Sequence, residues 1–258
     1  MLVSTLPVHA GAEDPPSLSG SVHHPPRTQL VDRIEFIVSR AAGKSVVDLG
    51  FVDESRMAAK QALGSWLHAK VAQVALGTVG IDNEPEGVQL ARDLGYQAHT
   101  ADCEDRESLI ALGLEPADIV IAGELLEHLD QPGRFLEAVK VLLKPGGTLL
   151  ISTPNACSMT NFLSSLMNRE FVNPDHVSWF SWQTLRTLLR RHDWSMREFA
   201  YYGFPRIAVP DSATRRDRRR TRAFNSYQRL SAPLFRFRPT LADGIIVVAG
   251  YERERELK

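Results

Sequence analysis

Three of four side chains that can bind a cation or move a proton are grouped in the sequence. Glu124, Glu127 and His128 follow an apolar run directly, and His176 comes from a later loop. On a helical turn Glu124 and Glu127 share a face, with His128 at i+4 from Glu124. Two carboxylates and two imidazoles can hold one Mg²⁺, Mn²⁺, Fe²⁺ or Zn²⁺ and leave positions open for substrate oxygens.

Two further interpretations of these residues stay open. Without a metal, His128 or His176 can act as the general base that removes the proton of a hydroxyl. In a purely structural role, Glu127 and His128 begin a helix and His176 caps the next one. We expect Glu124, Glu127, His128 and His176 as metal ligands, and Glu127, His128 and His176 as catalytic residues.

Acidic side chains also stand at the ends of the predicted strands. Asp48 ends the first strand, and Asp82, Asp102 and Glu124 follow the second, third and fourth. Because the carboxyl ends of parallel strands share one edge, these carboxylates line one crevice, which suits hydroxyls, an amine or a cation. Asp82 is placed to accept hydrogen bonds from a ribose diol. The alternative is that Asp48 and Asp82 cap helices.

The elements that must position these residues alternate along the chain. Short apolar runs predict strands at 45–49, 77–81, 96–100, 118–122 and 148–152. Amphipathic stretches predict helices at 28–42, 55–74, 84–94, 104–112 and 132–143, the last closed by a turn at 144–147. Beyond these we expect helices near 158–167 and 181–191 and strands at 194–202 and 244–251. The pattern indicates an α/β fold, a Rossmann-like, mostly parallel sheet with helices on both faces.

A series of short motifs carries a family resemblance. In chain order they are Ser45-Val46-Val47-Asp48-Leu49-Gly50, Val79-Gly80-Ile81-Asp82, Ala101-Asp102, the run from Ala122 to Leu129, Leu143-Lys144-Pro145-Gly146-Gly147 and Thr153-Pro154-Asn155. Over about residues 28–203 the series resembles the class I S-adenosylmethionine-dependent methyltransferases. The resemblance implies S-adenosylmethionine as cofactor and a seven-stranded sheet whose last strand is antiparallel.

The resemblance also implies a cofactor site. Asp48 and Gly50 would meet the methionine end, Asp82 the ribose and Asp102 the adenine amine. The full set expected at the cofactor is Asp48, Gly50, Phe51, Asp82, Asn83, Asp102, Cys103 and Glu124. The Glu-x-x-Glu-His run with a distant His is similar to the metal-binding set of the small-RNA terminal 2′-O-methyltransferases, and the ubiquinone-pathway O-methyltransferases carry a similar run.

The loop after the first strand departs from the family pattern. The family has three spaced glycines there, whereas this chain has Gly50-Phe51-Val52-Asp53-Glu54-Ser55 and keeps only the first. Glycines let a backbone approach a ligand closely, so the loop is either rearranged and still binding, or it weakens the site. The loop also lacks the Gly-x-Gly-x-x-Gly pattern of nicotinamide-binding folds.

Composition and charge exclude several protein classes. The 258 residues include 30 Lys and Arg against 31 Asp and Glu, and the net charge of −1 gives no global case for binding nucleic acid. Two cysteines exclude a disulfide framework, and no apolar run is long enough to cross a membrane. We expect a poorly ordered arm at 1–26 and one domain at 27–258, with an insertion at 204–240 and a cytoplasmic location.

Six arginines crowd the window 215–222 of this insertion: Arg215, Arg216, Arg218, Arg219, Arg220 and Arg222. We expect a solvated loop there, and contact with a phosphate-bearing substrate, RNA or a membrane is the alternative.

Together the motifs predict a methyltransferase acting on a hydroxyl of a small-molecule or carbohydrate-like acceptor, assisted by Mg²⁺ or Mn²⁺. A divalent cation on adjacent hydroxyls lowers their pKa and orients them for in-line displacement. A second hypothesis is 2′-O-methylation of an RNA 3′ end. A third is a non-catalytic relative that binds a nucleoside or a partner protein.

Overall fold

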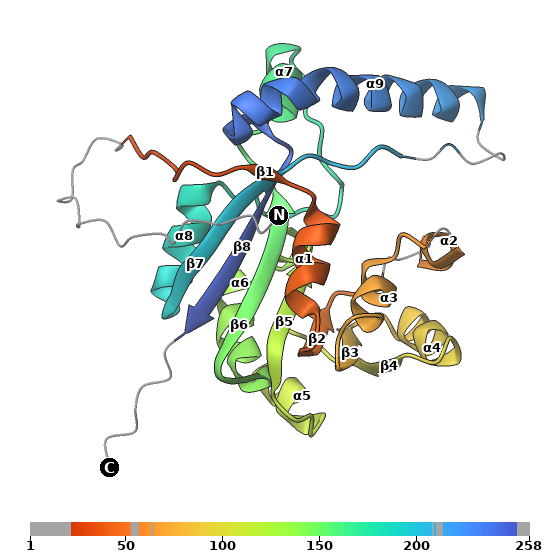
Figure 1. Cartoon of the computed structure of the whole chain (residues 1–258), viewed down its shortest axis with the longest axis vertical. Helices are drawn as coiled ribbons and strands as arrows, with labels where there is room; N and C mark the ends of the chain where they lie inside the picture. Colours follow the sequence, from red (N-terminus) through yellow and green to blue (C-terminus); the bar gives the residue numbers. More distant parts are fainter. Residues whose placement is uncertain (1–21, 53–56, 63, 208, 210–213, 252–258) are drawn as a thin grey trace.

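An eight-stranded sheet forms the centre of the structure (Figure 1). The computed structural model describes residues 22–52, 57–62, 64–207, 209 and 214–251. The strands are β1 (Leu30–Val31), β2 (Ser45–Leu49), β3 (Gly77–Asp82), β4 (Gln97–Thr100), β5 (Ala117–Gly123), β6 (Leu143–Pro154), β7 (Trp194–Tyr202) and β8 (Gly244–Tyr251). The helices are α1 (Arg33–Ala41), α2 (Met57–Ala62), α3 (Leu67–Ala72), α4 (Pro85–Asp93), α5 (Arg106–Ala111), α6 (Pro132–Ala138), α7 (Met159–Leu166), α8 (Trp182–Arg191) and α9 (Arg215–Phe237). Short 3₁₀ turns are η2 (Leu126–His128), η3 (Val139–Leu142) and η4 (Pro239–Leu241).

The strand order is β1-β7-β8-β6-β5-β2-β3-β4. β8 runs antiparallel to β6 and β7, and the other neighbouring strands are parallel. This confirms a mostly parallel sheet with an antiparallel last strand. The sheet has one strand more than predicted, because Leu30–Val31, expected within a helix, pairs with β7. Helix α1 begins only after Asp32, whose side chain accepts a hydrogen bond from the Glu35 amide.

Helices cover both faces of the sheet, as predicted. Neighbouring residues of a strand point to opposite faces. Val46 of β2 packs in a cluster with Ile37 of α1 on one face. Val47 packs on the other face in a cluster that includes Phe135 of α6 and Leu189 of α8. A strand that is apolar on both sides is therefore buried on both sides.

The chain reverses its progress across the sheet between β2 and β5. From β2 it moves outward to β3 and β4, and then returns to β5 on the other side of β2. In open α/β sheets, ligands bind beyond the carboxyl ends of the two strands that flank such a reversal. Those ends are Leu49 of β2 and Gly123 of β5.

Other segments also differ from their predicted form. The predicted helix at 55–74 is divided into α2 and α3, with an extended backbone at Trp66. The predicted turn at 144–147 lies within β6. The arginine-rich segment begins helix α9 instead of forming a loop, because arginine favours helix and Thr214 caps it by accepting a hydrogen bond from the Asp217 amide.

The chain termini and the insertion complete the fold. Most of the predicted arm at 1–26 lies outside the described residues, and its part from residue 22 onward is neither helix nor strand. The predicted insertion at 204–240 contains α9, which lies beside α7 (Figure 1). Within the described ranges, every helix is too short or too polar to cross a bilayer.

Candidate active site

A cavity of about 610 Å³ opens at the carboxyl ends of β2 and β5. Asp48 lines it from β2 and Gly50 from directly after β2, and Glu124 and His128 line it from the segment after β5. His176 lines it from the loop between α7 and α8. The cavity thus joins residues expected at the methionine end of a cofactor with residues of the expected catalytic cluster.

The segments after both strands contain a residue with a left-handed backbone. Gly50 has a φ of 64° and Glu124 a φ of 57°. At Gly50 space also excludes a side chain, because an added Cβ would lie 2.7 Å from Leu125. A left-handed conformation costs a glutamate on the order of 1–2 kcal/mol. Such strain persists where the surroundings hold it, and here the Glu124 amide donates to the Ser152 carbonyl oxygen at 2.8 Å.

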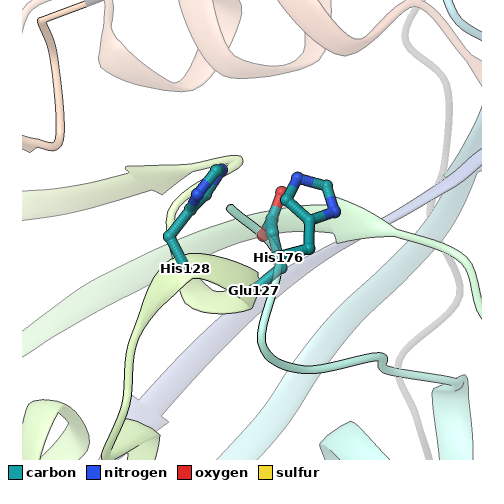
Figure 2. Close-up of side chains that lie close together, drawn as sticks. All are labelled: Glu127, His128 and His176. Atoms are coloured by element: carbon teal, nitrogen blue, oxygen red, sulfur yellow. The ribbon is translucent and has the colours of Figure 1, made fainter. Parts of the chain in front are cut away.

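Glu127, His128 and His176 form a compact cluster (Figure 2). Each offers one ligand atom, and these atoms lie within 4.8 Å of one another. The rings of His128 and His176 meet edge to face, with centroids 4.6 Å apart. Glu127 and His128 belong to η2. The loop that contains His176 is held beside η2 by hydrogen bonds, because the amides of Val177 and Ser178 donate to the Glu127 carbonyl oxygen.

The surroundings of this cluster favour neutral side chains when no cation is bound. Burial, followed by the negative charge of Glu124, raises the pKa of Glu127 to about 8. Both carboxylate oxygens of Glu127 are buried and make no hydrogen bond of normal geometry with the described residues, although the Thr153 hydroxyl lies near enough to act against the rise in pKa. Burial, followed by His128, lowers the pKa of His176, whose Nδ1 atom is likewise buried without a partner. Because buried polar atoms normally have partners, these oxygens and this nitrogen are candidate ligand atoms.

Glu124, the fourth expected ligand, belongs to a second cluster. Its carboxylate accepts a hydrogen bond from the Tyr202 hydroxyl and lies 3.9 Å from the Arg33 guanidinium. Gly244 makes room for Tyr202, since an added Cβ would lie 2.1 Å from its ring. Lys60 lines the same part of the cavity, and burial lowers the pKa of its amine, followed by the positive charge of Arg33. The structure brings three of the four expected ligands together and gives Glu124 other partners.

Two side chains of the glycine-poor loop after β2 occupy space beside glycines of β3 and α4. The Phe51 ring occupies the space beside Gly80, where an added Cβ would lie 2.7 Å from it. Val52 occupies the space beside Gly87, where the same distance would be 2.2 Å. The Val52 amide also donates to Oδ2 of Asp82 at 2.9 Å. Phe51 and Val52 are therefore packed against β3 and α4, whereas residues 53–55 of this loop lie outside the described residues.

Four residues expected at the cofactor are not among those that line this cavity. Asp82 accepts a second hydrogen bond, from the Glu84 amide, and burial raises the pKa of its carboxyl group. Glu84 itself caps α4, so Asp82 is not the N-cap. Asn83 and Asp102 are exposed, one after β3 and the other after β4. Cys103 is half-buried, and burial raises the pKa of its thiol to about 12.

The polar residues of the cavity that were missed from the sequence include Arg33, Lys60 and His68. His68 pairs with Asp48, which therefore bonds to a side chain instead of capping a helix. Arg33 and Lys60 occur in stretches with a helical pattern, where a charged residue normally indicates the solvent side. No spacing signal distinguishes them from surface residues.

Comparison with known proteins gives a family and related folds. A family model described as a methyltransferase domain matches residues 23–198. Ubiquinone biosynthesis O-methyltransferase of Caulobacter vibrioides is 33% identical over 100 residues, which is 36% of this chain and 38% of that protein. The enzyme of the same name from Paraburkholderia phytofirmans is 31% identical over 147 residues, 54% of this chain and 57% of that protein. The chain thus spans about half or less of the length of these relatives.

A solved structure gives a likeness of fold alone. The small RNA methyltransferase HEN1 has a TM-score of 0.52 and 19% identity, over 92% of this chain and 28% of that chain. At this identity the likeness concerns the arrangement of helices and strands.

Proposed function

The chain belongs to the methyltransferase domain family, and from this premise we propose that it transfers the methyl group of S-adenosylmethionine to a hydroxyl of a small molecule. Membership confirms the family that the motifs indicated. The observation that carries the proposed activity is that His128 and His176 line the same cavity as Asp48 and Gly50, with the buried Glu127 carboxylate beside them. The names of the curated relatives support oxygen as the atom that is methylated.

Methyl transfer to a hydroxyl requires alignment and removal of one proton. The hydroxyl oxygen attacks the methyl carbon in line with the carbon–sulfur bond, which breaks with its electron pair on sulfur. The sulfonium becomes the neutral thioether of S-adenosylhomocysteine, and the hydroxyl proton must leave. Without a cation, His128 or His176 accepts it in this proposal; with a cation on both imidazoles, the proton would leave to water. Because burial lowers the pKa of His176, its imidazole is neutral and able to accept a proton at neutral pH.

For the metal we propose Glu127, His128 and His176 as ligands. The buried, unpartnered oxygens of Glu127 and the Nδ1 atom of His176 fit a cation. Two imidazoles beside one carboxylate favour a transition metal such as Mn²⁺ over Mg²⁺, which prefers oxygen ligands. When bound, the cation would lower the pKa of the acceptor hydroxyl. The protein's own part is to hold the acceptor beside the methyl group.

For the cofactor we propose the residues of the family motifs. Asp48 and Gly50 lie at the cavity, where the methionine end would bind. Each carboxylate oxygen of Asp82 accepts one backbone hydrogen bond and keeps a lone pair for a ribose hydroxyl. Asp102 is exposed and accessible to an adenine amine.

The remaining wall of the cavity indicates the acceptor class. Phe171, Trp179 and Phe224 supply aromatic surface, and Thr160 and Asn161 supply polar groups. Such a wall suits a small hydroxyl-bearing acceptor with an apolar ring or a sugar-like part. A second candidate function, 2′-O-methylation of an RNA 3′ end, is favoured by the arginines of α9.

The cellular location that we propose is the cytoplasm. Both cysteines of the chain, Cys103 and Cys157, are free thiols. Unpaired thiols are expected in a reducing compartment.

The first test is calorimetric titration of S-adenosylhomocysteine into the full chain, with Mn²⁺ or Mg²⁺ present and again after chelation. Micromolar binding in either condition supports the cofactor site despite the altered loop. Absence of binding in both overturns the proposed activity and favours a non-catalytic binding protein. Transfer of a labelled methyl group to phenols, to sugars and to RNA with a free 3′ end then separates the acceptor classes.

A further inference from the structure

Helix α7 exposes large apolar side chains that nothing in the described part of the chain covers. None of its residues is buried, and Phe162 and Leu166 are 64% and 74% exposed. Met167, directly after the helix, is 60% exposed. Large apolar side chains gathered at a surface indicate contact with a partner or a lipid phase.

The second half of α9 also exposes large apolar side chains. Leu230 and Phe237 are 79% and 75% exposed. The two helices are in contact, because the Thr160 hydroxyl of α7 donates to the Tyr227 hydroxyl of α9 at 2.9 Å. The Thr160 hydroxyl also lies 3.2 Å from the buried Asp243 carboxylate, just before β8. We call this pair the α7–α9 layer; it lies at one end of the molecule (Figure 1).

The first half of α9 carries positive charge. Its exposed arginines are Arg215, Arg216, Arg219, Arg220 and Arg222. Arg219, Leu230 and Phe237 lie on one side of the helix, since separations of eleven and seven residues are close to whole turns. This side of α9 therefore passes from basic to apolar, while the exposed Arg229 and Arg236 add positive charge elsewhere on its second half.

We propose that the α7–α9 layer docks on a bilayer surface that contains anionic phospholipids. Phe162, Leu166 and Phe237 enter the interfacial region, and the arginines of α9 contact lipid phosphates. Charge complementarity favours this occupant over a second copy of the chain, which would bring further positive charge to the layer. Bound RNA would place phosphates against the arginines, but it would leave the exposed apolar side chains in water.

Docking on a bilayer goes beyond the proposed function. One consequence of it, the access of an acceptor to the cavity, rests on the proposed methyl transfer. Phe171 and Trp179 line the cavity and are 64% and 36% exposed, so the rim of the cavity is itself partly apolar. An acceptor with an apolar tail that resides in the bilayer would reach the cavity along this rim.

The test is cosedimentation of the full chain with vesicles, a measurement that needs no methyltransferase activity. One set of vesicles is phosphatidylcholine alone, and the other mixes it with phosphatidylglycerol. The apolar variant is Phe162→Ser with Leu166→Ser, and its control is Leu76→Ser, which changes an 81% exposed leucine between α3 and β3. The basic variant is Arg219→Gln with Arg222→Gln, and its control is Arg106→Gln in α5.

We expect the wild type and both controls to sediment with the mixed vesicles and to bind phosphatidylcholine much more weakly. The basic variant should bind the mixed vesicles roughly thirtyfold more weakly, since each charge near an anionic surface contributes a factor of about five. The apolar variant should lose at least about tenfold. Circular dichroism and thermal unfolding establish that the variants, which change exposed side chains, remain folded.

Three results would overturn the proposal. The first is a wild type that stays in the supernatant with mixed vesicles. The second is equal binding to both vesicle types, which removes the role of charge. The third is that both variants bind vesicles like the wild type, while the apolar variant dissociates a dimer or the basic variant no longer binds RNA.

Discussion

The Nδ1 atom of His68 lies 2.9 Å from Oδ2 of Asp48, and both side chains are buried in the wall of the cavity. The rings of Phe51, Trp66 and Tyr96 surround the imidazole at centroid distances of 4.7, 5.2 and 5.3 Å. The other ring nitrogen, Nε2, is buried without a hydrogen-bond partner among the described residues. Since Asp48 stands where the family motif implies the methionine end of the cofactor, its partner adds a second polar group there.

Substitution of His68 can separate the roles of its two nitrogens. In His68→Asn the amide nitrogen can replace Nδ1 and keep the bond to Asp48, whereas nothing replaces Nε2. We expect this variant to fold normally and to bind S-adenosylhomocysteine about tenfold more weakly, because one hydrogen bond of roughly 1.4 kcal/mol is lost. Calorimetry measures the affinity, and an unchanged value would show that Nε2 makes no contact with the cofactor.

His68→Leu is the matched comparison. It leaves the Asp48 carboxylate buried without its partner, so the free energy of unfolding should fall by about 1–3 kcal/mol. Urea denaturation of both variants distinguishes this structural loss from a loss of binding. Equal stability of the Asn and Leu variants would contradict the role of Nδ1.

Cation binding should depend on each member of the Glu127, His128 and His176 cluster. Glu127→Gln and His176→Ala each remove one ligand, and we expect Mn²⁺ to bind at least about a hundredfold more weakly. Calorimetric titration with Mn²⁺ measures the change. The control is His192→Asn. His192 lies at the end of α8, and its side chain forms a hydrogen bond with Glu137. If both variants bind Mn²⁺ as tightly as the wild type, the cluster is not its site.

The fold was predictable because its signals are local. Strands buried on both faces give short apolar runs, and β8 has the predicted bounds, 244–251. The position of the cavity follows from the same pattern, since the carboxyl ends of parallel strands share one edge. The two-residue strand β1 was missed, because a pair of apolar residues beside a helix has no periodicity of its own.

The arrangement of the cluster was less predictable, and backbone conformation explains why. The spacing argument placed Glu124 and Glu127 on one face of a helix. In the structure the 3₁₀ turn η2 begins only at Leu126, and Glu124 has a left-handed backbone. The two carboxylates therefore belong to different clusters. The Asp48–His68 pair is beyond any spacing rule as well, because it joins β2 to α3 and α2 lies between them in the chain.

Replacing Glu124 in two ways measures the strain at this position. Glu124→Ala and Glu124→Gly both remove the carboxylate that bonds to Tyr202 and lies near Arg33. They differ in backbone preference, since glycine adopts a φ of 57° without a steric penalty. We expect the glycine variant to be more stable than the alanine variant by about 1 kcal/mol in urea denaturation. Equal stabilities would show that the turn relaxes to another conformation.

A final prediction concerns Asp118, far from the cavity, at the start of β5. Its carboxylate accepts hydrogen bonds from Lys144 at 2.9 Å and from the amide and hydroxyl of Ser45 at 2.9 and 2.8 Å. The bond from Lys144, followed by those from Ser45, holds the pKa of Asp118 well below its usual range. A lowered carboxyl pKa stabilises the folded state above the unfolded pKa of about 4, and this contribution is lost as the pH falls toward the folded value.

Asp118→Asn should therefore lower the free energy of unfolding by about 1 kcal/mol at pH 7, with a smaller difference at pH 3. Thermal unfolding at both pH values tests this. Glu107→Gln is the control, because its exposed pair with Arg106, at 3.3 Å, should contribute little at either pH. The stability difference between the wild type and Asp118→Asn could instead be the same at both pH values. In that case the hydrogen bonds of Asp118, and not its charge, would account for its contribution to stability.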